Sequence, residues 1–298
     1  MTVEIAKTLE DRSEFSFRWF AERPIYVNYN NSFVDRTLPV VPNAKIGDIA
    51  CGTGIISNRI FSHYQKAQQE AEIIGIEPNT AALVDVRQNV PSSQKIRTVF
   101  IEGTAADFIN FVEPNSLDIA YFCNAIHEIS KEEDKLASLV AIYRTLKPCG
   151  KLFINSAFTQ EMFSDRTMLV QWARLRQRAM EILGKSRDKG KPGFGVYATE
   201  YYAALLTSAG FVVKNINKTL VEVDSDDIRA ISKYDTYIDG QLMDMQNSEK
   251  FTLRQKSDAL LQAIDDSEEQ LRKTSGDQNA VLRLTRNWVE IEAEKAAA

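Results

Sequence analysis

Short apolar runs alternate with segments of helical periodicity through the first half of the chain. The runs lie at residues 44–50, 71–78, 97–103, 117–124 and 151–158. Between them, apolar residues recur every three or four positions, as on one face of an amphipathic helix, and these segments lie at 57–69, 79–90 and 131–150. Strands that alternate with helices predict a parallel sheet with helices on both faces, the doubly wound α/β class.

The alternation changes after the fifth run. Residues 160–184 have the pattern of a long helix. A second helix is predicted to start with Thr199 as its N-cap. Two later segments, 211–223 and 287–293, have the pattern of strands. The last strand can return antiparallel, because a long helical excursion precedes it. The sequence therefore predicts an N-terminal helical segment, 1–44, and one domain, 45–298, with helical cap insertions at about 159–196 and 224–285.

Composition indicates the general class of protein. The chain has 298 residues, of which 44% are apolar and 26% are charged, as in ordinary globular proteins. No apolar run approaches the ~20 residues of a membrane span, and the first residues lack a signal-peptide core. We therefore expect a cytoplasmic protein without a membrane partner, either a monomer or a homodimer.

Charge and histidine content limit the ligands. The net charge is −5 and no block of Lys and Arg occurs, so the sequence does not predict a nucleic-acid partner. With two histidines and no Asp/His cluster, it does not predict a metal site either.

The stretch GDIACGTGII, residues 47–56, combines an acid with two glycines at the end of the first run. Gly52 and Gly54 allow the backbone to approach a ligand closely. A dinucleotide, a phosphate and a sulfonium nucleoside could each use such a turn. Glu77 ends the second run, where a carboxylate can accept both hydroxyls of a ribose.

Two details favour the sulfonium nucleoside. A dinucleotide fingerprint has Gly or Ala three positions after its second Gly, whereas this chain has Ser57 three positions after Gly54, and two positions before Gly52 it has Ala50 and not Gly. Asp48 would repel a pyrophosphate but attract an ammonium group. S-adenosylmethionine carries an amino group and a sulfonium, and no phosphate.

The segment DIACGTG resembles the first motif of the class I S-adenosylmethionine-dependent methyltransferases. The resemblance covers most of 45–157, then 197–223 and the closing strand. It implies a Rossmann-like, seven-stranded sheet with an antiparallel final strand, and S-adenosyl-L-methionine as the cofactor.

The resemblance also implies a set of cofactor-binding residues. These are Asp48, Ala50, Cys51, Gly52, Thr53, Gly54, Glu77, Pro78, Thr104, Ala105, Asn124 and Ala125. In this family the first acid helps to hold the methionine moiety, and the acid after the second strand binds the ribose. Thr104 stands where the family usually has an Asp that meets the adenine amino group, so the Ala105 backbone or Asp107 would take that role. The backbone of Asn124 would face the methionine amino group.

His127 is the candidate catalytic residue. It follows Asn124 by three positions, between the expected methyl donor and the acceptor. Imidazole has an ordinary pKa of about 6.5 and can take a proton from a hydroxyl at neutral pH. The alternative is a structural histidine that caps or packs under the following helix.

We expect methyl transfer to an O, N or C atom of a small-molecule acceptor, such as a secondary metabolite, enclosed by the segments outside the sheet. The acids between 224 and 244 are expected mostly on a solvated helix face, with one or two available to orient a cationic amine; they are Asp224, Asp226, Asp227, Asp235, Asp239 and Asp244. Two alternatives stay open: a methyltransferase for a protein or RNA, and a protein that binds S-adenosylmethionine for another reaction.

Overall fold

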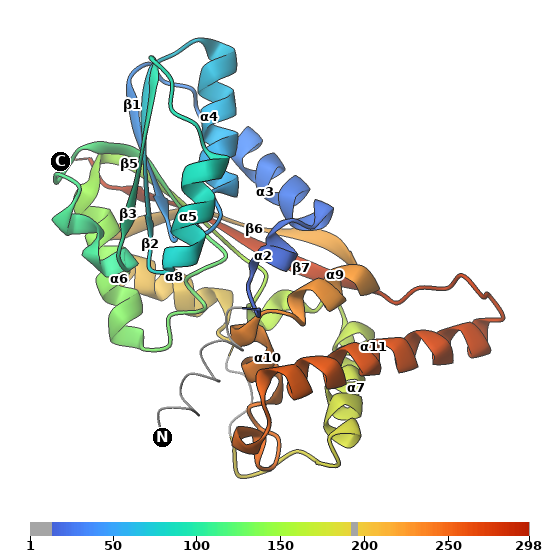
Figure 1. Cartoon of the computed structure of the whole chain (residues 1–298). Coiled ribbons are helices and arrows are strands. Elements are labelled where there is room, and N and C mark those ends of the chain that lie inside the picture. Colours follow the sequence, from blue (N-terminus) through green and yellow to red (C-terminus); the bar gives the residue numbers. More distant parts are fainter. Residues whose placement is uncertain (1–13, 192–195, 298) are drawn as a thin grey trace, which may run out of the picture. The chain divides into compact units, whose positions relative to one another are not determined.

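The computed structural model describes residues 14–191 and 196–297. Its strands follow the apolar runs closely. They are β1 (Ala44–Ile49), β2 (Ala71–Glu77), β3 (Ile96–Glu102), β4 (Leu117–Cys123), β5 (Leu146–Ser156), β6 (Phe211–Asp224) and β7 (Arg283–Lys295). They form one seven-stranded sheet in the order β3-β2-β1-β4-β5-β7-β6 (Figure 1).

Strand directions confirm the predicted fold class. β1 pairs in parallel with β2 and with β4, and β4 pairs in parallel with β5. β7 runs antiparallel to β5, with Ile154 opposite Ile291. The sheet is therefore doubly wound with an antiparallel final strand.

The helices lie in the segments between and beyond the strands. They are α2 (Arg18–Ala21), α3 (Pro24–Thr37), α4 (Ile55–Ala67), α5 (Thr80–Asn89), α6 (Glu132–Thr145), α7 (Arg166–Ile182), α8 (Thr199–Ser208), α9 (Ser225–Ile231), α10 (Asp235–Leu242) and α11 (Leu253–Ser275). Among the described residues, no helix is both long and apolar enough to span a bilayer.

Alternating side chains of β4 divide the core of the sheet into two layers. Ile119 and Tyr121 pack with residues of α3, α4 and α5. Ala120 and Phe122 pack with residues of α6 and α8. Because successive strand residues point to opposite faces, an apolar run without polar alternation indicates a strand that is covered on both faces, as observed.

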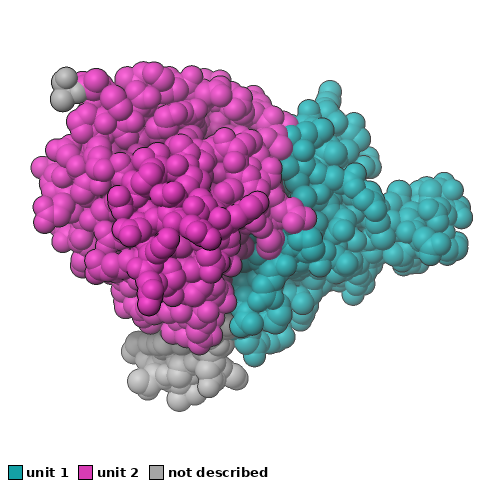
Figure 2. Space-filling view, turned by 90° about the horizontal axis from the view of Figure 1, so that it is seen from above, with its two compact units in different colours: residues 1–26, 163–195, 220–286 teal, residues 27–162, 196–219, 287–298 magenta. Residues whose placement is uncertain are grey.

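The chain divides into two compact units (Figure 2). One contains Val27–Met162, Val196–Thr219 and Asn287–Ala298, and it holds most of the sheet. The other contains Met1–Tyr26, Phe163–Gly195 and Leu220–Arg286. Its core includes Met180 of α7, Ile238 of α10 and Leu260 of α11.

Local signals predicted one helix start correctly and another wrongly. Asn79 caps α5, and its side chain accepts hydrogen bonds from the backbone N–H groups of Ala81 and Ala82. Thr199 does not cap α8, because Ala198 occupies the N-cap position. The Thr199 hydroxyl instead donates to Glu161 Oε2 at 2.8 Å. The Thr199 hydroxyl thus bonds the carboxylate of Glu161, which is distant in the sequence, instead of the N-cap bond within its own helix that the sequence predicted.

Candidate cofactor site

The site lies where the strand order reverses. β1 has β2 on one side and β4 on the other, so the chain leaves the ends of β1 and β4 in opposite directions. In open α/β sheets, this point forms a crevice beyond the carboxyl ends of the strands. The structure places three predicted segments at such ends: the turn after β1, Glu77 at the end of β2 and Asn124 after β4.

The turn after β1 has a left-handed backbone at three positions. The φ angles are 54° at Ala50, 52° at Gly52 and 90° at Gly54. An alanine in this region costs roughly 1–2 kcal/mol, and such strain concentrates at functional sites. Cys51 N–H donates to the Ile76 carbonyl at 3.1 Å, which ties the turn to β2.

A side chain at either glycine of the turn would have a different consequence. A Cβ added at Gly52 would meet no atom within 4 Å. A Cβ added at Gly54 would lie 2.5 Å from Val86 Cγ2 and 2.8 Å from Val90 Cγ2. Gly52 therefore borders open space, whereas Gly54 is required for packing against α5 and the residue that follows it.

Glu77 joins the end of β2 to the turn. Gly52 N–H donates to Glu77 Oε2 at 3.0 Å, and Asn79 N–H donates to Oε1 at 2.9 Å. The residue is 8% exposed. Burial raises the pKa of Glu77, and the bonds from Asn79 and Gly52 offset this only in part. A carboxylate can accept about four hydrogen bonds, so each oxygen has capacity for a ligand hydroxyl.

Asp48 lies deeper than Glu77. It is 1% exposed, and its Oδ2 accepts bonds from Ser57 N–H at 3.0 Å and from the Ser57 hydroxyl at 2.6 Å. Burial raises the pKa of Asp48 to about 7, although the Ser57 bonds act in the opposite direction. Asp48 therefore connects β1 to the start of α4, and any direct ligand contact would have to use its small exposed fraction.

Thr104 and Asp107 form a capping box after β3. The backbone N–H and the hydroxyl of Thr104 donate to Asp107 Oδ2 at 3.0 and 2.6 Å. These bonds, the side-chain bond first, lower the pKa of Asp107. Ala105 begins the short 3-10 helix Ala105–Asn110 and is buried. Asp107 thus organises this loop.

His127 contacts two residues at the end of β5. Its Nδ1 lies 3.1 Å from the Ser156 hydroxyl. Its ring centroid lies 4.7 Å from that of Phe158. Ser156 Oγ also accepts a bond from Phe158 N–H at 3.0 Å, so one serine connects the histidine to the loop after β5.

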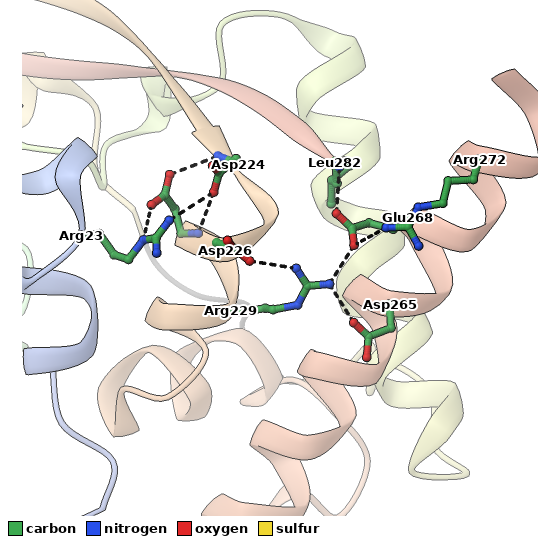
Figure 3. Close-up of polar contacts among 9 residues, drawn as sticks. Arg23, Asp224, Asp226, Arg229, Asp265, Glu268, Arg272 and Leu282 are labelled. Atoms are coloured by element: carbon green, nitrogen blue, oxygen red, sulfur yellow. Dashed lines mark hydrogen bonds and ion pairs between the residues drawn. The ribbon is translucent and has the colours of Figure 1, made fainter. Parts of the chain in front are cut away.

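Five of the six acids between 224 and 244 lie in ion pairs, and Asp235 instead accepts bonds from the backbone N–H and the hydroxyl of Thr236. Arg23 pairs with Asp224 and Asp227, and Arg229 pairs with Asp226 (Figure 3). The remaining pairs are Asp239 with Lys256, and Asp244 with Arg176 and Arg187. Asp227 and Asp244 are 4% and 0% exposed, so these two do not lie on the solvated face that was expected for most of the six. Among the described residues, no group of three or more His, Cys, Asp or Glu is placed to hold a metal ion.

The seven-stranded sheet with its antiparallel final strand matches a Rossmann-like methyltransferase fold. Residues 46–150 match the family model described as a methyltransferase domain. Residues 46–150 therefore carry a methyltransferase domain, and the comparisons support S-adenosyl-L-methionine as its cofactor.

Solved structures share the fold at low sequence identity. A protein from Bacillus halodurans C-125, proposed to be a methyltransferase, is 14% identical with a TM-score of 0.55, over 90% of this chain and 100% of that one. The cyclase SpnF is 16% identical with a TM-score of 0.52, over 92% and 82%. Phosphoethanolamine N-methyltransferase 2 from Haemonchus contortus is 17% identical with a TM-score of 0.51, over 96% and 57%. No curated protein sequence matches the chain.

Proposed function

We propose that this protein transfers a methyl group from S-adenosylmethionine to a small-molecule acceptor. The observation that carries the proposal is the pairing of an open backbone at Gly52 with a buried acceptor at Glu77, joined by a hydrogen bond of 3.0 Å. A ribose at this point can donate both hydroxyls to Glu77 while its nucleoside lies against Gly52.

The charges in the site support a cationic ligand. Burial raises the pKa values of both Asp48 and Glu77, so both carboxylates would gain from a nearby positive charge. S-adenosylmethionine carries an ammonium and a sulfonium, whereas NAD brings a pyrophosphate. In our proposal, the negative charge of Asp48 attracts the ammonium group of the methionine moiety. Asp48 also holds Ser57 at the start of α4 by a hydrogen bond.

The chain's own residues have to align the methyl donor with the acceptor and, for a hydroxyl acceptor, remove its proton. When bound, the cofactor supplies a methyl group that is already activated, so alignment and exclusion of water are the main tasks. We assign the proton transfer to His127. In this assignment the imidazole ring takes the proton of a hydroxyl acceptor, and the contact of Nδ1 with the Ser156 hydroxyl at 3.1 Å orients the ring.

The acceptor class is inferred from charge and from the family. A net charge of −5 disfavours a nucleic-acid substrate. The phosphoethanolamine N-methyltransferase shares the fold, which supports a small acceptor, whereas the cyclase SpnF shows that the fold occurs in a protein named for another reaction. Whether the reaction is methyl transfer or another one, our proposal assigns cofactor binding to Asp48, Glu77 and the turn.

Isotopic labelling tests the proposal. The protein is incubated with S-adenosylmethionine carrying a labelled methyl group and with a cell extract, which is then separated into small molecules and macromolecules. We expect labelled small molecules with the wild type and a loss of label with Glu77→Ala. Label confined to the protein or RNA fraction would favour the macromolecular alternative, and cofactor binding without any labelled product would favour a reaction other than methyl transfer.

A further inference from the structure

The side chain of Asn124 is held at both ends by buried residues. Its Oδ1 accepts a hydrogen bond from Trp288 Nε1 at 2.8 Å. Its Nδ2 donates to Asn30 Oδ1 at 3.4 Å, and Asn155 Nδ2 donates to the same oxygen at 3.1 Å. Asn30, Asn155 and Trp288 are all at most 1% exposed. An amide held in this way has one orientation.

The backbone of Asn124 has a conformation that the side-chain contacts help to maintain. Its φ angle is 52°, in the left-handed region, where asparagine is tolerated better than most residues but still pays a cost. Its N–H donates to the Asn155 carbonyl at 2.9 Å. Without the contacts to its amide, residue 124 could relax towards a right-handed or extended conformation and change the direction of the chain after β4.

Trp288 is itself fixed in place. Its ring stacks on Tyr29 with centroids 4.2 Å apart and an interplanar angle of 18°. The Tyr29 hydroxyl donates to Glu290 Oε1 at 2.7 Å. Glu290 also accepts bonds from Arg36 and from Thr219, the latter at 2.9 Å. The indole N–H is therefore aimed at Asn124 by a rigid support.

These supporting residues come from outside the segment that matches the family model. Asn30 lies on α3, Asn155 on β5 and Trp288 on β7, whereas the match covers residues 46–150. Helix α3 and the final strand thus both contact one residue of the candidate cofactor site.

We propose that Trp288 and Asn30 are positioning residues for cofactor binding. They hold Asn124 in its left-handed conformation, and so fix the backbone after β4 where it meets the amino group of S-adenosylmethionine. The inference rests on the proposed function and on the resemblance to the methyltransferase family, which implies that this amino group faces the backbone of Asn124.

The test compares two tryptophan variants. Trp288→Phe keeps an aromatic ring but removes the bond to Asn124. Trp172→Phe is the matched control, because Trp172 is also buried and its Nε1 donates to an amide oxygen, Gln241 Oε1, at 3.0 Å. We expect Trp288→Phe to raise the Kd for S-adenosylmethionine about tenfold, the size expected when a buried amide loses its partner, and Trp172→Phe to leave it within about twofold.

A second background separates positioning from general destabilisation. Glycine adopts positive φ without support from a side chain, so in an Asn124→Gly protein the Trp288→Phe change should no longer affect the Kd. Asn30→Ala should likewise raise the Kd in the wild-type background and leave it unchanged in the Asn124→Gly background. It replaces Trp288→Phe if that variant does not fold.

The possible results distinguish this inference from the proposed function. An unchanged Kd in Trp288→Phe, or an equal rise in both backgrounds, would overturn the positioning role while the wild type still binds the cofactor. A wild type that does not bind S-adenosylmethionine at all would overturn the proposed function instead.

Discussion

At the scale of single residues, Gly52 and Gly54 should respond differently to the same change. Gly54→Ala places a Cβ 2.5 Å from Val86 Cγ2, so we expect a loss of about 3 kcal/mol in stability from overpacking and a strained φ. Gly52→Ala meets no protein atom within 4 Å and should cost only about 1 kcal/mol, for its φ of 52°. Because that Cβ would occupy the ligand's space, Gly52→Ala should nevertheless abolish cofactor binding. Thermal unfolding and calorimetry measure the two effects, and a Gly52→Ala protein with normal affinity would contradict the assignment.

His127 gives a second prediction at this scale. A general base typically contributes 10²–10⁴-fold, so with a hydroxyl acceptor His127→Ala should lower kcat by about that factor. The affinity for S-adenosylmethionine should change little, because the contacts of His127 are with Ser156 and Phe158. Single-turnover rates and cofactor titrations separate the two quantities. A kcat within a fewfold of the wild type would make His127 structural and would favour a nitrogen acceptor.

The sequence predicted the type of residue in the site better than the role of each residue. It singled out Gly52, Gly54 and Glu77, because a turn after a strand and an acid after the next strand are local patterns. It could not separate the two glycines, since the difference depends on Val86, more than thirty positions away. Asn30 was not singled out, because a lone asparagine in a helix carries no signal that its side chain bonds Asn124.

At the scale of elements, Glu268 of α11 connects α9 and the start of β7 (Figure 3). It accepts bonds from Arg229 at 2.8 Å, from Arg272 at 3.2 Å and from Leu282 N–H at 3.2 Å. Burial acts to raise the pKa of Glu268, but bonds from Ser225, Arg229 and Leu282 outweigh it, and the net pKa lies below the ordinary 4.5. A lowered folded-state pKa means that the stabilisation is complete above about pH 4.5 and is lost as the pH falls further.

Glu268→Gln should therefore lower the free energy of unfolding by about 2 kcal/mol at pH 7, the usual loss for a hydrogen bond to a charged group. The difference from the wild type should shrink below pH 4.5. Asp265→Asn is the matched control, because Asp265 bonds the same Arg229 but its side chain is 62% exposed, so it should cost less than about 0.5 kcal/mol. Denaturant unfolding at several pH values measures both, and a difference between wild type and Glu268→Gln that does not change with pH would contradict this role.

The elements themselves were largely predictable, because the apolar runs of a sheet covered on both faces lack polar alternation and are distinct from the helical segments between them. The start of α8 was not, since Thr199 bonds a carboxylate from another segment, Glu161. The burial of Asp227 in α9 and of Asp244, which follows α10, was not predictable for a related reason. Asp227 and Asp244 are buried only because Arg23, Arg176 and Arg187 neutralise them, and these partners lie far away in the sequence.

At the scale of the whole molecule, net charge bears on the acceptor. With a net charge of −5 and a sequence pI of about 5.3, the chain should repel a polyanion. We expect the fluorescence anisotropy of a labelled RNA of about 20 nucleotides to stay constant up to about 10 µM protein at about 0.15 M salt. Saturable binding below that concentration would favour a macromolecular acceptor.

Isothermal calorimetry determines whether the turn after β1 and Glu77 bind S-adenosylmethionine. The wild type should bind S-adenosylmethionine and should not prefer NAD, whose pyrophosphate would face Asp48 and Glu77. Glu77→Ala should weaken the binding by roughly 2–3 kcal/mol, from the loss of two charge-assisted bonds that water replaces in part. An unchanged affinity in Glu77→Ala, or a wild type that prefers NAD, would contradict the claim.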